Sequence, residues 1–233
     1  MNNINSFMMS AMMVDKEGSC APAWLTAEEE AAVVNESYMS VIGRFVRLSL
    51  RTGLSLPEIL GLRWNAFDYK SRPYRLRILE VRPEEPIVLS NAKEQKNYPR
   101  ILVLPRDLGE ELEEYVEIME YAHSISSKID QSPYMIVDEN GATMSREKFE
   151  LEFSLLLRDA GVRSLPFSAL RNTFIQNAFS SGMPAEVVYM ILGILPSYGF
   201  SKDHASFMEE NYVNNVTYDL LWDTYPYVDW TLK

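Results

Sequence analysis

The amino-acid sequence predicts an α+β domain that is mostly α-helical and carries one small antiparallel β-sheet. Apolar residues recur every three or four positions over most of the chain, as they do on the buried face of an amphipathic helix. Only residues 74–104 contain segments that read as β-strands, and polar turns separate them. Apolar-type residues make up 47% of the 233 residues, which is enough to bury the core of one domain.

Two helix starts carry a capping box, in which a Ser or Thr side chain and the Glu three positions later each accept the other's backbone N–H. Thr26 and Glu29 open a helix that is predicted to run from residue 25 to about residue 50. Ser55 and Glu58 open the next helix. Apolar spacing predicts further helices over residues 107–123, 145–160, 168–181, 184–192 and 204–223.

The predicted sheet consists of three segments, residues 74–81, 86–90 and 100–104, which are rich in Val, Ile and Leu. A polar turn with basic residues at its tip connects the last two segments. The organisation predicted for the whole chain is a flexible N-terminal arm at residues 1–24, a folded domain at residues 25–217 and an aromatic C-terminal tail at residues 218–233.

Charge is distributed unevenly along the chain. The formal net charge of -11 argues, on average, against a nucleic-acid partner. Residues 44–106, however, hold 13 of the 22 basic residues and only 6 acids, so this segment carries +7 and the remainder carries -18. Two interpretations stay open: the basic segment forms a nucleic-acid surface, or it is an ordinary solvated surface.

Cofactors, disulfides and membranes are not indicated by the residue types present. The single cysteine, Cys20, has no partner for an intramolecular disulfide, so we expect a reducing, cytoplasmic setting. One cysteine and two histidines do not fit a structural zinc site, and no phosphate-binding glycine motif occurs, so we expect no cofactor. No apolar run approaches the ~18 residues that span a bilayer, so we expect no membrane partner.

Two sequence motifs stand on either side of the basic hairpin and the run ILVLP at residues 101–105. The first is LSLRTGLSLPEILGLRWNAFD at residues 48–68, and the second is LPFSALRNTFIQNAFSSGMPAEVVYMILG at residues 165–193. These stretches resemble the two signatures and the lysine-bearing hairpin of the tyrosine recombinases, the phage integrase family. The resemblance spans about residues 25–215 and implies the helical catalytic-domain fold of that family. The matched positions of the first signature are Thr52, Gly53, Leu54, Glu58, Leu60, Leu62, Trp64 and Asp68.

The resemblance implies catalytic roles for three residues. The family cuts DNA without a metal: a tyrosine attacks the phosphate to form a 3′-phosphotyrosyl link, arginines bind the phosphate oxygens and a lysine protonates the leaving oxygen. Arg171 matches the second family arginine, with a structural arginine paired to an acid as the alternative. Lys93 best matches the hairpin lysine, ahead of Lys96. Tyr212 best matches the nucleophile, ahead of Tyr198, with a packed aromatic side chain as the alternative.

Other catalytic positions of the family are substituted in this chain. Ser55 stands at the first arginine, Ser168 at the histidine or lysine that precedes the second arginine by three, and Ile194 at the histidine of the L-G-H motif. Arg51 and His204 are candidates to replace the lost groups. Since cations at the phosphate oxygens stabilise the transition state, the resemblance implies a degenerate active site with impaired cleavage or none.

Five basic residues are candidate DNA contacts, and they fall into two groups. Three share one helix face at positions i, i+3 and i+7, which fits either a row of phosphate contacts or plain surface. The other two belong to the predicted hairpin, where solubility is the alternative explanation. The five residues are Arg44, Arg47, Arg51, Lys96 and Arg100.

Three functions are compatible with these observations. The first is a protein that binds double-stranded DNA, related to DNA recombination and integration, with little or no cleavage activity. The second is a protein-interaction module, associating with itself or another protein through the tail at residues 218–233. The acidic composition suggests this function, and so do the residues before position 25, which are too few for the family's N-terminal clamp domain. The third is an active strand-transferase that uses Arg171, Lys93 and Tyr212.

Overall fold

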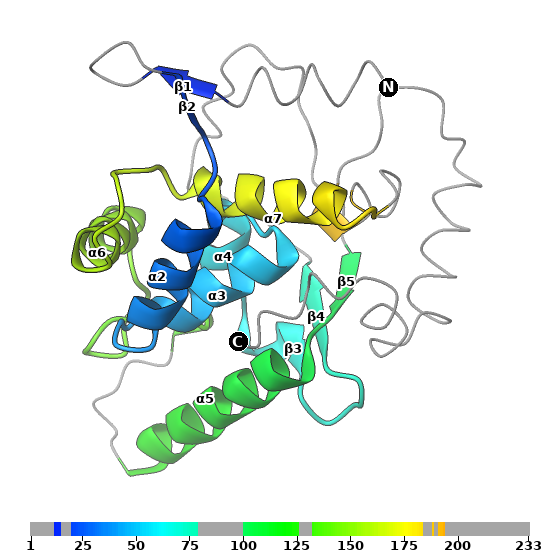
Figure 1. The fold of residues 1–233 in the computed structure, drawn as a ribbon. Helices are drawn as coiled ribbons and strands as arrows, with labels where there is room; N and C mark the ends of the chain where they lie inside the picture. Colours follow the sequence, from blue (N-terminus) through cyan, green and yellow to red (C-terminus); the bar gives the residue numbers. More distant parts are fainter. Residues whose placement is uncertain are drawn as a thin grey trace.

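A computed structural model of the chain describes residues 12–14, 20–78, 100–125, 132–183, 188 and 191–193. The described part is mostly helical, with one three-stranded antiparallel sheet and a separate two-stranded hairpin, so the predicted α+β class is confirmed. Helices α2, α3 and α4 lie between α7 and α5, and the sheet lies beside them (Figure 1). The elements are β1 (Met12–Val14), β2 (Cys20–Pro22), α2 (Ala27–Ser37), α3 (Gly43–Thr52), α4 (Leu56–Leu60), the 3-10 helix η1 (Trp64–Ala66), β3 (Phe67–Asp68), β4 (Arg75–Ile78), β5 (Arg100–Val103), α5 (Arg106–Ile125), α6 (Arg146–Asp159) and α7 (Ser168–Ser180).

The helix predicted over residues 25–50 is in fact two helices, α2 and α3, joined by a turn at residues 38–42, so the prediction of one continuous helix is wrong. Gly43 makes the turn possible, because a Cβ at this position would lie 1.6 Å from the carbonyl oxygen of Ser37. Apolar residues continue at helical spacing across the turn, although Tyr38 and Val41 within it are exposed. Periodicity alone therefore does not reveal the break.

Both predicted capping boxes are present. The hydroxyl of Thr26 accepts the Glu29 N–H at 3.2 Å, and the Glu29 carboxylate accepts the Thr26 N–H at 2.9 Å. At the start of α4, the Glu58 carboxylate accepts the Ser55 N–H at 2.8 Å. Ser168 is the first residue of α7 but makes no side-chain cap. The box at α4 fixes the Glu58 carboxylate beside Ser55.

The sheet has the strand order β3–β4–β5, with both pairs antiparallel. Phe67 of β3 lies opposite Leu76 of β4, which in turn lies opposite Leu102 of β5. All three side chains are buried, so one face of the sheet packs against the helices. β3 was not predicted, because a two-residue strand carries too little alternation to be recognised.

The other predicted elements divide between the described and undescribed parts of the chain. The strands predicted at residues 74–81 and 100–104 are present as β4 and β5, and the three helices predicted between residues 107 and 181 are confirmed as α5, α6 and α7. Residues 188, 191 and 192 of the helix predicted at 184–192 are helical. The strand predicted at 86–90 and the helix predicted at 204–223 lie outside the described residues.

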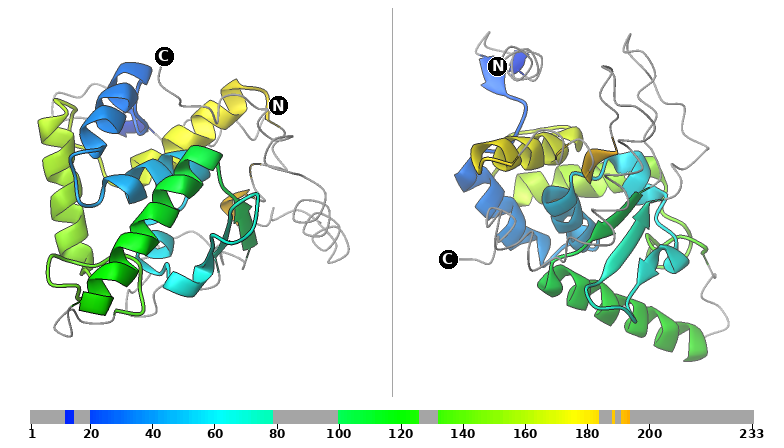
Figure 2. Two further views of the ribbon diagram at one scale, coloured as in Figure 1. Left: turned by 90° about the horizontal axis from the view of Figure 1, so that it is seen from below. Right: turned by 90° about the vertical axis from the view of Figure 1, so that its right-hand side faces the viewer.

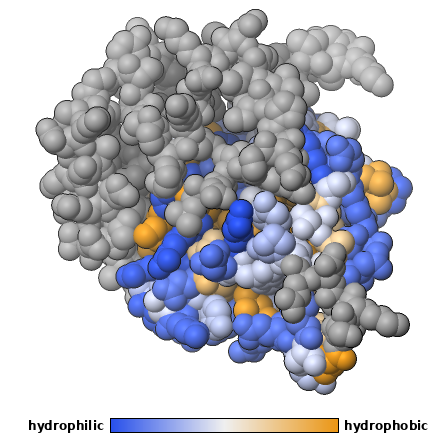
Figure 3. All heavy atoms as spheres, turned by 180° about the vertical axis from the view of Figure 1, so that it is seen from behind, coloured by the Kyte–Doolittle hydropathy of each residue, from blue (hydrophilic) through white to orange (hydrophobic). Residues whose placement is uncertain are grey.

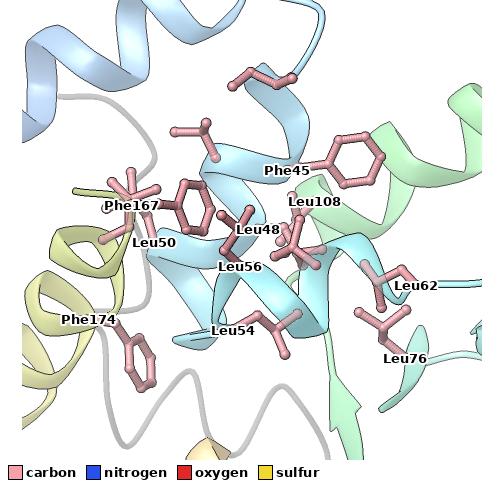
Figure 4. Packing of buried hydrophobic residues seen from close by; sticks show 14 of the residues in the cluster. Phe45, Leu48, Leu50, Leu54, Leu56, Leu62, Leu76, Leu108, Phe167 and Phe174 are labelled. Atoms are coloured by element: carbon pink, nitrogen blue, oxygen red, sulfur yellow. The ribbon is translucent and has the colours of Figure 1, made fainter. Parts of the chain in front are cut away.

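Helix α3 forms the centre of the hydrophobic core. Its side chains Phe45, Leu48 and Leu50 are buried, and α3 packs on α2, α5 and α7. Figure 4 shows these residues together with Phe174 of α7 and Leu108 of α5. The additional views in Figure 2 place α6 at the side of the molecule away from the sheet.

The segment that precedes α2 is docked on α7. The Leu25 N–H donates to the hydroxyl of Thr173 at 2.9 Å, and the Asn172 amide donates to the Ala23 carbonyl at 3.0 Å. Further upstream, β1 and β2 form an antiparallel pair. The arm predicted at residues 1–24 therefore contains paired strands that were not predicted from the sequence.

The described surface on one face of the molecule is mainly hydrophilic (Figure 3). Seen from the side opposite to Figure 1, polar residues cover most of the coloured surface and hydrophobic residues appear as small separate spots (Figure 3). None of the described helices combines the length and the apolar character that crossing a membrane demands.

Candidate functional site

A buried carboxylate, that of Glu58 on α4, lies at the centre of the candidate site. Its Oε2 atom accepts the Ser55 hydroxyl and backbone N–H, both at 2.8 Å, and lies 3.3 Å from Nη1 of Arg171. Its Oε1 atom accepts a hydrogen bond from Nη1 of Arg100 at 2.6 Å. One acid thus joins side chains from the start of α4, from β5 and from α7.

Arg171, the residue matched to the second family arginine, is held in a fixed position by backbone oxygens. Its Nη1 atom donates to the Gly53 carbonyl at 2.7 Å, and its Nη2 atom donates to the Leu192 carbonyl at 3.1 Å. Its side chain keeps 15% of its accessible surface, whereas that of Glu58 keeps none. Arg171 therefore pairs with an acid, as expected for the alternative in which it is a structural arginine. Part of its side chain is still exposed to solvent.

Arg100 lies deeper in the same cluster. Its Nε atom donates to the Ile191 carbonyl at 2.6 Å, and only 8% of its side chain is exposed. The backbone at Gly193 approaches it so closely that a Cβ there would lie 2.7 Å from Nη1 of Arg100. The buried Nη2 atom of Arg100 has no hydrogen-bond partner among the described residues.

The three charged groups of the cluster affect one another strongly. Burial alone would raise the pKa of the Glu58 carboxyl, but the charges of Arg100 and Arg171 outweigh burial and hold that pKa below its usual range. Burial lowers the pKa of Arg171; the Glu58 charge opposes this effect and the Arg100 charge adds to it. Two guanidinium groups sharing one carboxylate leave the cluster with a net charge of about +1.

The structure corrects the location of Arg100, which the sequence analysis placed on the hairpin surface. Its partner Glu58 is 42 positions away in the sequence, so no local motif reveals the pair. One signal was available: Arg100, Leu102 and Leu104 alternate, and all three are buried on the same side of the chain. An arginine in phase with buried leucines predicts an internal ion pair better than a surface contact.

Two of the candidate DNA contacts on α3 are paired with acids of α5. Arg47 is buried, forms an ion pair with Glu111 and donates to the hydroxyl of Ser37 at 2.6 Å. Arg51 binds Asp107 with both carboxylate oxygens in reach, at 2.7 and 3.0 Å. These two arginines therefore do not form an open row of phosphate contacts. That they contact DNA stays a prediction, and their ion pairs with acids of α5 do not favour it.

The third candidate on this helix, Arg44, lies over an aromatic ring. Its guanidinium carbon is 4.0 Å from the centre of the Tyr115 ring, a cation–π geometry. Burial raises the pKa of Tyr115 to about 12, so its hydroxyl stays neutral and donates to the Met135 carbonyl at 2.7 Å. All three arginines of α3 are thus packed against α5, whereas other basic residues of the segment, such as Arg63 and Arg106, are exposed.

The remaining predicted site positions are only partly described. Ser55 lies in the Glu58 cluster, and Ser168 is exposed at the start of α7, one helical turn before Arg171. Neither serine offers a positive charge. The predicted positions that lie outside the described residues are Lys93, Lys96, Ile194, Tyr198, His204, Tyr212 and the tail at residues 218–233.

A concave feature apart from the Glu58 cluster lies between η1, β3 and α5. It is an open groove of about 770 Å³ whose lining includes Trp64, Phe67, Lys70, Met119 and His123. Within the described ranges, no three His, Cys, Asp or Glu side chains are grouped so that they could hold a metal ion. The groove shows no convergent ion pairs of the kind found around Glu58.

Comparison with protein families and curated proteins agrees with this architecture. The family model described as "Phage integrase family" matches residues 24–194. The protein "Tyrosine recombinase XerC-like" of Caldanaerobacter subterraneus subsp. tengcongensis is 26% identical over 158 residues. The matched region covers 63% of this chain and 40% of that relative, so the chain spans well under two thirds of the relative's length.

Solved structures of recombinases share the fold. The crystal structure of XerA recombinase has a TM-score of 0.58 at 15% identity, covering 88% of this chain and 64% of that chain. The Tn1549 transposon integrase in complex with transposon right end DNA has a TM-score of 0.56 at 17% identity, with coverages of 82% and 66%. XerH recombinase bound to its difH substrate has a TM-score of 0.55 at 15% identity, with coverages of 81% and 54%.

Proposed function

The chain belongs to the phage integrase family, and on that premise we propose that it binds double-stranded DNA as a recombinase relative whose cleavage site is weakened. The observation that supports the proposal is the hydroxyl of Ser55 beside the buried Glu58, since the sequence resemblance matches Ser55 to the family's first arginine. A hydroxyl brings no charge to a phosphate oxygen. Loss of one such donor commonly lowers the rate ~10²–10³-fold.

Ser168 supports the same conclusion at a second position. It is exposed at the start of α7, where the family carries a histidine or lysine, and it lies one turn before Arg171. A serine there is neither a cation nor a general acid near neutral pH. Ser55 and Ser168 are neutral, whereas the family carries charged residues at the positions matched to them. This difference supports weak or absent cleavage of DNA by this chain.

DNA as the partner is supported by the fold and by Arg171. The Tn1549 integrase and XerH structures with this fold are complexes with DNA, by their descriptions. A guanidinium group suits phosphate because its planar fork donates two parallel hydrogen bonds. Arg171 keeps 15% of its side-chain surface exposed, more than Arg100 or Glu58 in the same cluster.

Electrophoretic mobility of a random duplex tests DNA binding. We expect the wild-type protein to retard the duplex at ~50 mM salt and to release it at ~200 mM, because phosphate-driven binding weakens steeply with salt. Arg171→Gln removes the charge but keeps a donor for the Gly53 carbonyl, and it should weaken binding. The control is Arg158→Ala, since Arg158 is exposed and pairs only with its neighbour Asp159 in the described structure. A wild-type protein that retards no duplex at ~50 mM salt removes the proposal.

The pairing of basic residues with α5 favours a second candidate function, a protein-interaction module. Arg47 and Arg51 are neutralised by Glu111 and Asp107, which leaves less positive surface for DNA than the sequence suggests. In this case no duplex is bound, and the chain associates with itself or another protein. Light scattering of the full chain, compared with a variant that lacks residues 218–233, tests self-association through the tail.

A further inference from the structure

We propose that Arg100 supplies the second cation of a phosphate-binding site together with Arg171, and so takes over the position that Ser55 has lost. The inference deepens the proposed function, on which it rests for its biological ligand, a DNA phosphodiester. A free phosphate ion has the same tetrahedral oxyanion chemistry, so it tests the site without DNA.

The first support is geometric. Arg100 and Arg171 bind the two oxygens of the same carboxylate, Oε1 and Oε2 of Glu58, at 2.6 and 3.3 Å. They also donate to consecutive backbone carbonyls, those of Ile191 and Leu192, at 2.6 and 3.1 Å. Two guanidinium groups are thus fixed side by side on one turn and one acid, as a site for a single anionic group requires.

The second support is charge. Arg47 and Arg51 each have a carboxylate of their own, from Glu111 and Asp107. Arg100 and Arg171 share one carboxylate, so a positive charge is left over in a place with little water. An uncompensated charge in such an environment is strongly unfavourable in general. An anion bound at the cluster removes that cost.

The third support is an unused donor. Nη2 of Arg100 is buried and has no partner in the part of the chain that the structure describes. A buried guanidinium N–H without an acceptor is unfavourable. A phosphate oxygen is the acceptor that suits it, because arginine–phosphate hydrogen bonds are charge-assisted. Ser55, which is partly exposed, donates to the other oxygen of the same carboxylate, Oε2 of Glu58.

Thermal unfolding in inorganic phosphate, compared with chloride at equal ionic strength, tests the site directly. The proteins are the wild type, Arg100→Gln, Arg100→Lys and the double variant Arg100→Gln/Ser55→Arg. We expect phosphate to raise the Tm of the wild type, with a phosphate Kd that is at least about tenfold weaker in Arg100→Gln. Arg100→Lys keeps the buried positive charge, so this variant serves if the Arg100→Gln protein does not fold. One ammonium group cannot bind Glu58, the Ile191 carbonyl and phosphate together, so the stabilisation by phosphate should be smaller in Arg100→Lys than in the wild type.

The double variant separates binding from a structural role. An arginine at position 55 restores the second cation but not the bonds of Arg100 to Glu58 and Ile191, so we expect the phosphate effect to return while part of the stability loss remains. The inference is overturned if phosphate stabilises the wild type no more than chloride does, or if a folded Arg100 variant responds to phosphate as the wild type does.

The same proteins on a random duplex separate this inference from the proposed function. In a plot of log binding constant against log salt, Arg100→Gln should have a slope less steep than the wild type by about 0.9, the loss of one phosphate contact. An Arg100-dependent phosphate effect without duplex binding keeps the phosphate site and rejects DNA as its ligand. Duplex binding with an unchanged slope, and no phosphate effect, keeps DNA binding and rejects Arg100.

Discussion

Arg100 and Glu58, which are 42 positions apart in the sequence, form a buried ion pair in which Nη1 lies 2.6 Å from Oε1. The pair ties β5 to α4, and Arg171 joins it from α7. The polar centre of this domain is therefore also a structural junction, and changes there should affect both stability and anion binding.

Removing the shared carboxylate should destabilise the fold severely. Glu58→Ala leaves Arg100 and Arg171 facing each other with no counter-charge, and breaking a buried ion pair in this way costs about 3–5 kcal/mol. The control is Glu139→Ala, because Glu139 is largely exposed and pairs with Lys148 at the surface. Urea denaturation measures both. Equal losses in the two variants would show that the Glu58 cluster contributes no more than a surface pair.

The close approach of Gly193 to Arg100 predicts a specific difference between two glycines. Gly193 and Gly161 both have a left-handed φ, +66° and +70°, so alanine is strained at either position. At Gly161 a Cβ meets nothing within 4 Å, whereas at Gly193 it lies 2.7 Å from Nη1 of Arg100. We expect Gly161→Ala to cost about 1 kcal/mol and Gly193→Ala to cost a further ~1–3 kcal/mol. Chemical denaturation measures the free energy of unfolding of both variants. Equal losses in the two would contradict a close contact between Gly193 and Arg100.

Glu30 on α2 should make the protein less stable as pH rises. Burial raises the pKa of its carboxyl to about 8, against one hydrogen bond from Asn177 that lowers it. Oε1 of this group is buried without a partner among the described residues. The folded chain keeps a proton that the unfolded chain releases near the ordinary value, so the free energy of unfolding falls between about pH 4.5 and about pH 8.

Glu30→Gln removes this dependence, because the amide has no charge to bury. We expect the variant to gain on the order of 1–3 kcal/mol over the wild type at about pH 8.5, and much less at about pH 5. The exposed Glu28 of the same helix is the control: backbone and Thr26 hydrogen bonds lower its pKa. Glu28→Gln should leave the difference between the two pH values as it is in the wild type. A flat wild-type profile over this range contradicts the assignment.

Arg47 should matter for folding and not for DNA. It is buried, paired with Glu111 and bonded to Ser37, so Arg47→Ala should cost about 1.5–3 kcal/mol. The salt dependence of duplex binding should be unchanged. Arg158→Ala, at an exposed arginine, should change neither quantity. A lower salt slope in Arg47→Ala, with the fold intact, would restore Arg47 to the set of DNA contacts.

The sequence predicts local features of this fold better than contacts between distant segments. The capping boxes at Thr26 and Ser55 are visible because cap and acid are three positions apart, and they are present as predicted. The break between α2 and α3 is not visible, since it depends on the approach of Gly43 to the Ser37 backbone. Periodicity reports which face is buried and does not report where a helix turns.

The candidate site shows the same division. Arg171 and Ser55 are singled out by the two signatures because each lies within a motif, whereas Glu58 is recognised only as a helix cap and a scaffold position of the first signature. Arg100 is assigned to the surface because its acid comes from another element, and only its alternation with buried leucines reveals its true environment. Net charge per segment is misleading for a related reason: Arg47 and Arg51 of α3 are neutralised by acids of α5 that fall in a different part of the chain.

The central claim is that this chain binds DNA and cleaves it weakly or not at all. The most direct measurement incubates the protein with a nicked suicide duplex at ~50 mM salt and divides each sample between a native and a denaturing gel. The account predicts a retarded duplex on the native gel and no covalent protein–DNA adduct on the denaturing gel. An adduct that forms in the wild type and disappears in Tyr212→Phe would contradict it by showing an active strand-transferase, and a duplex that is not retarded would contradict it by removing DNA as the partner.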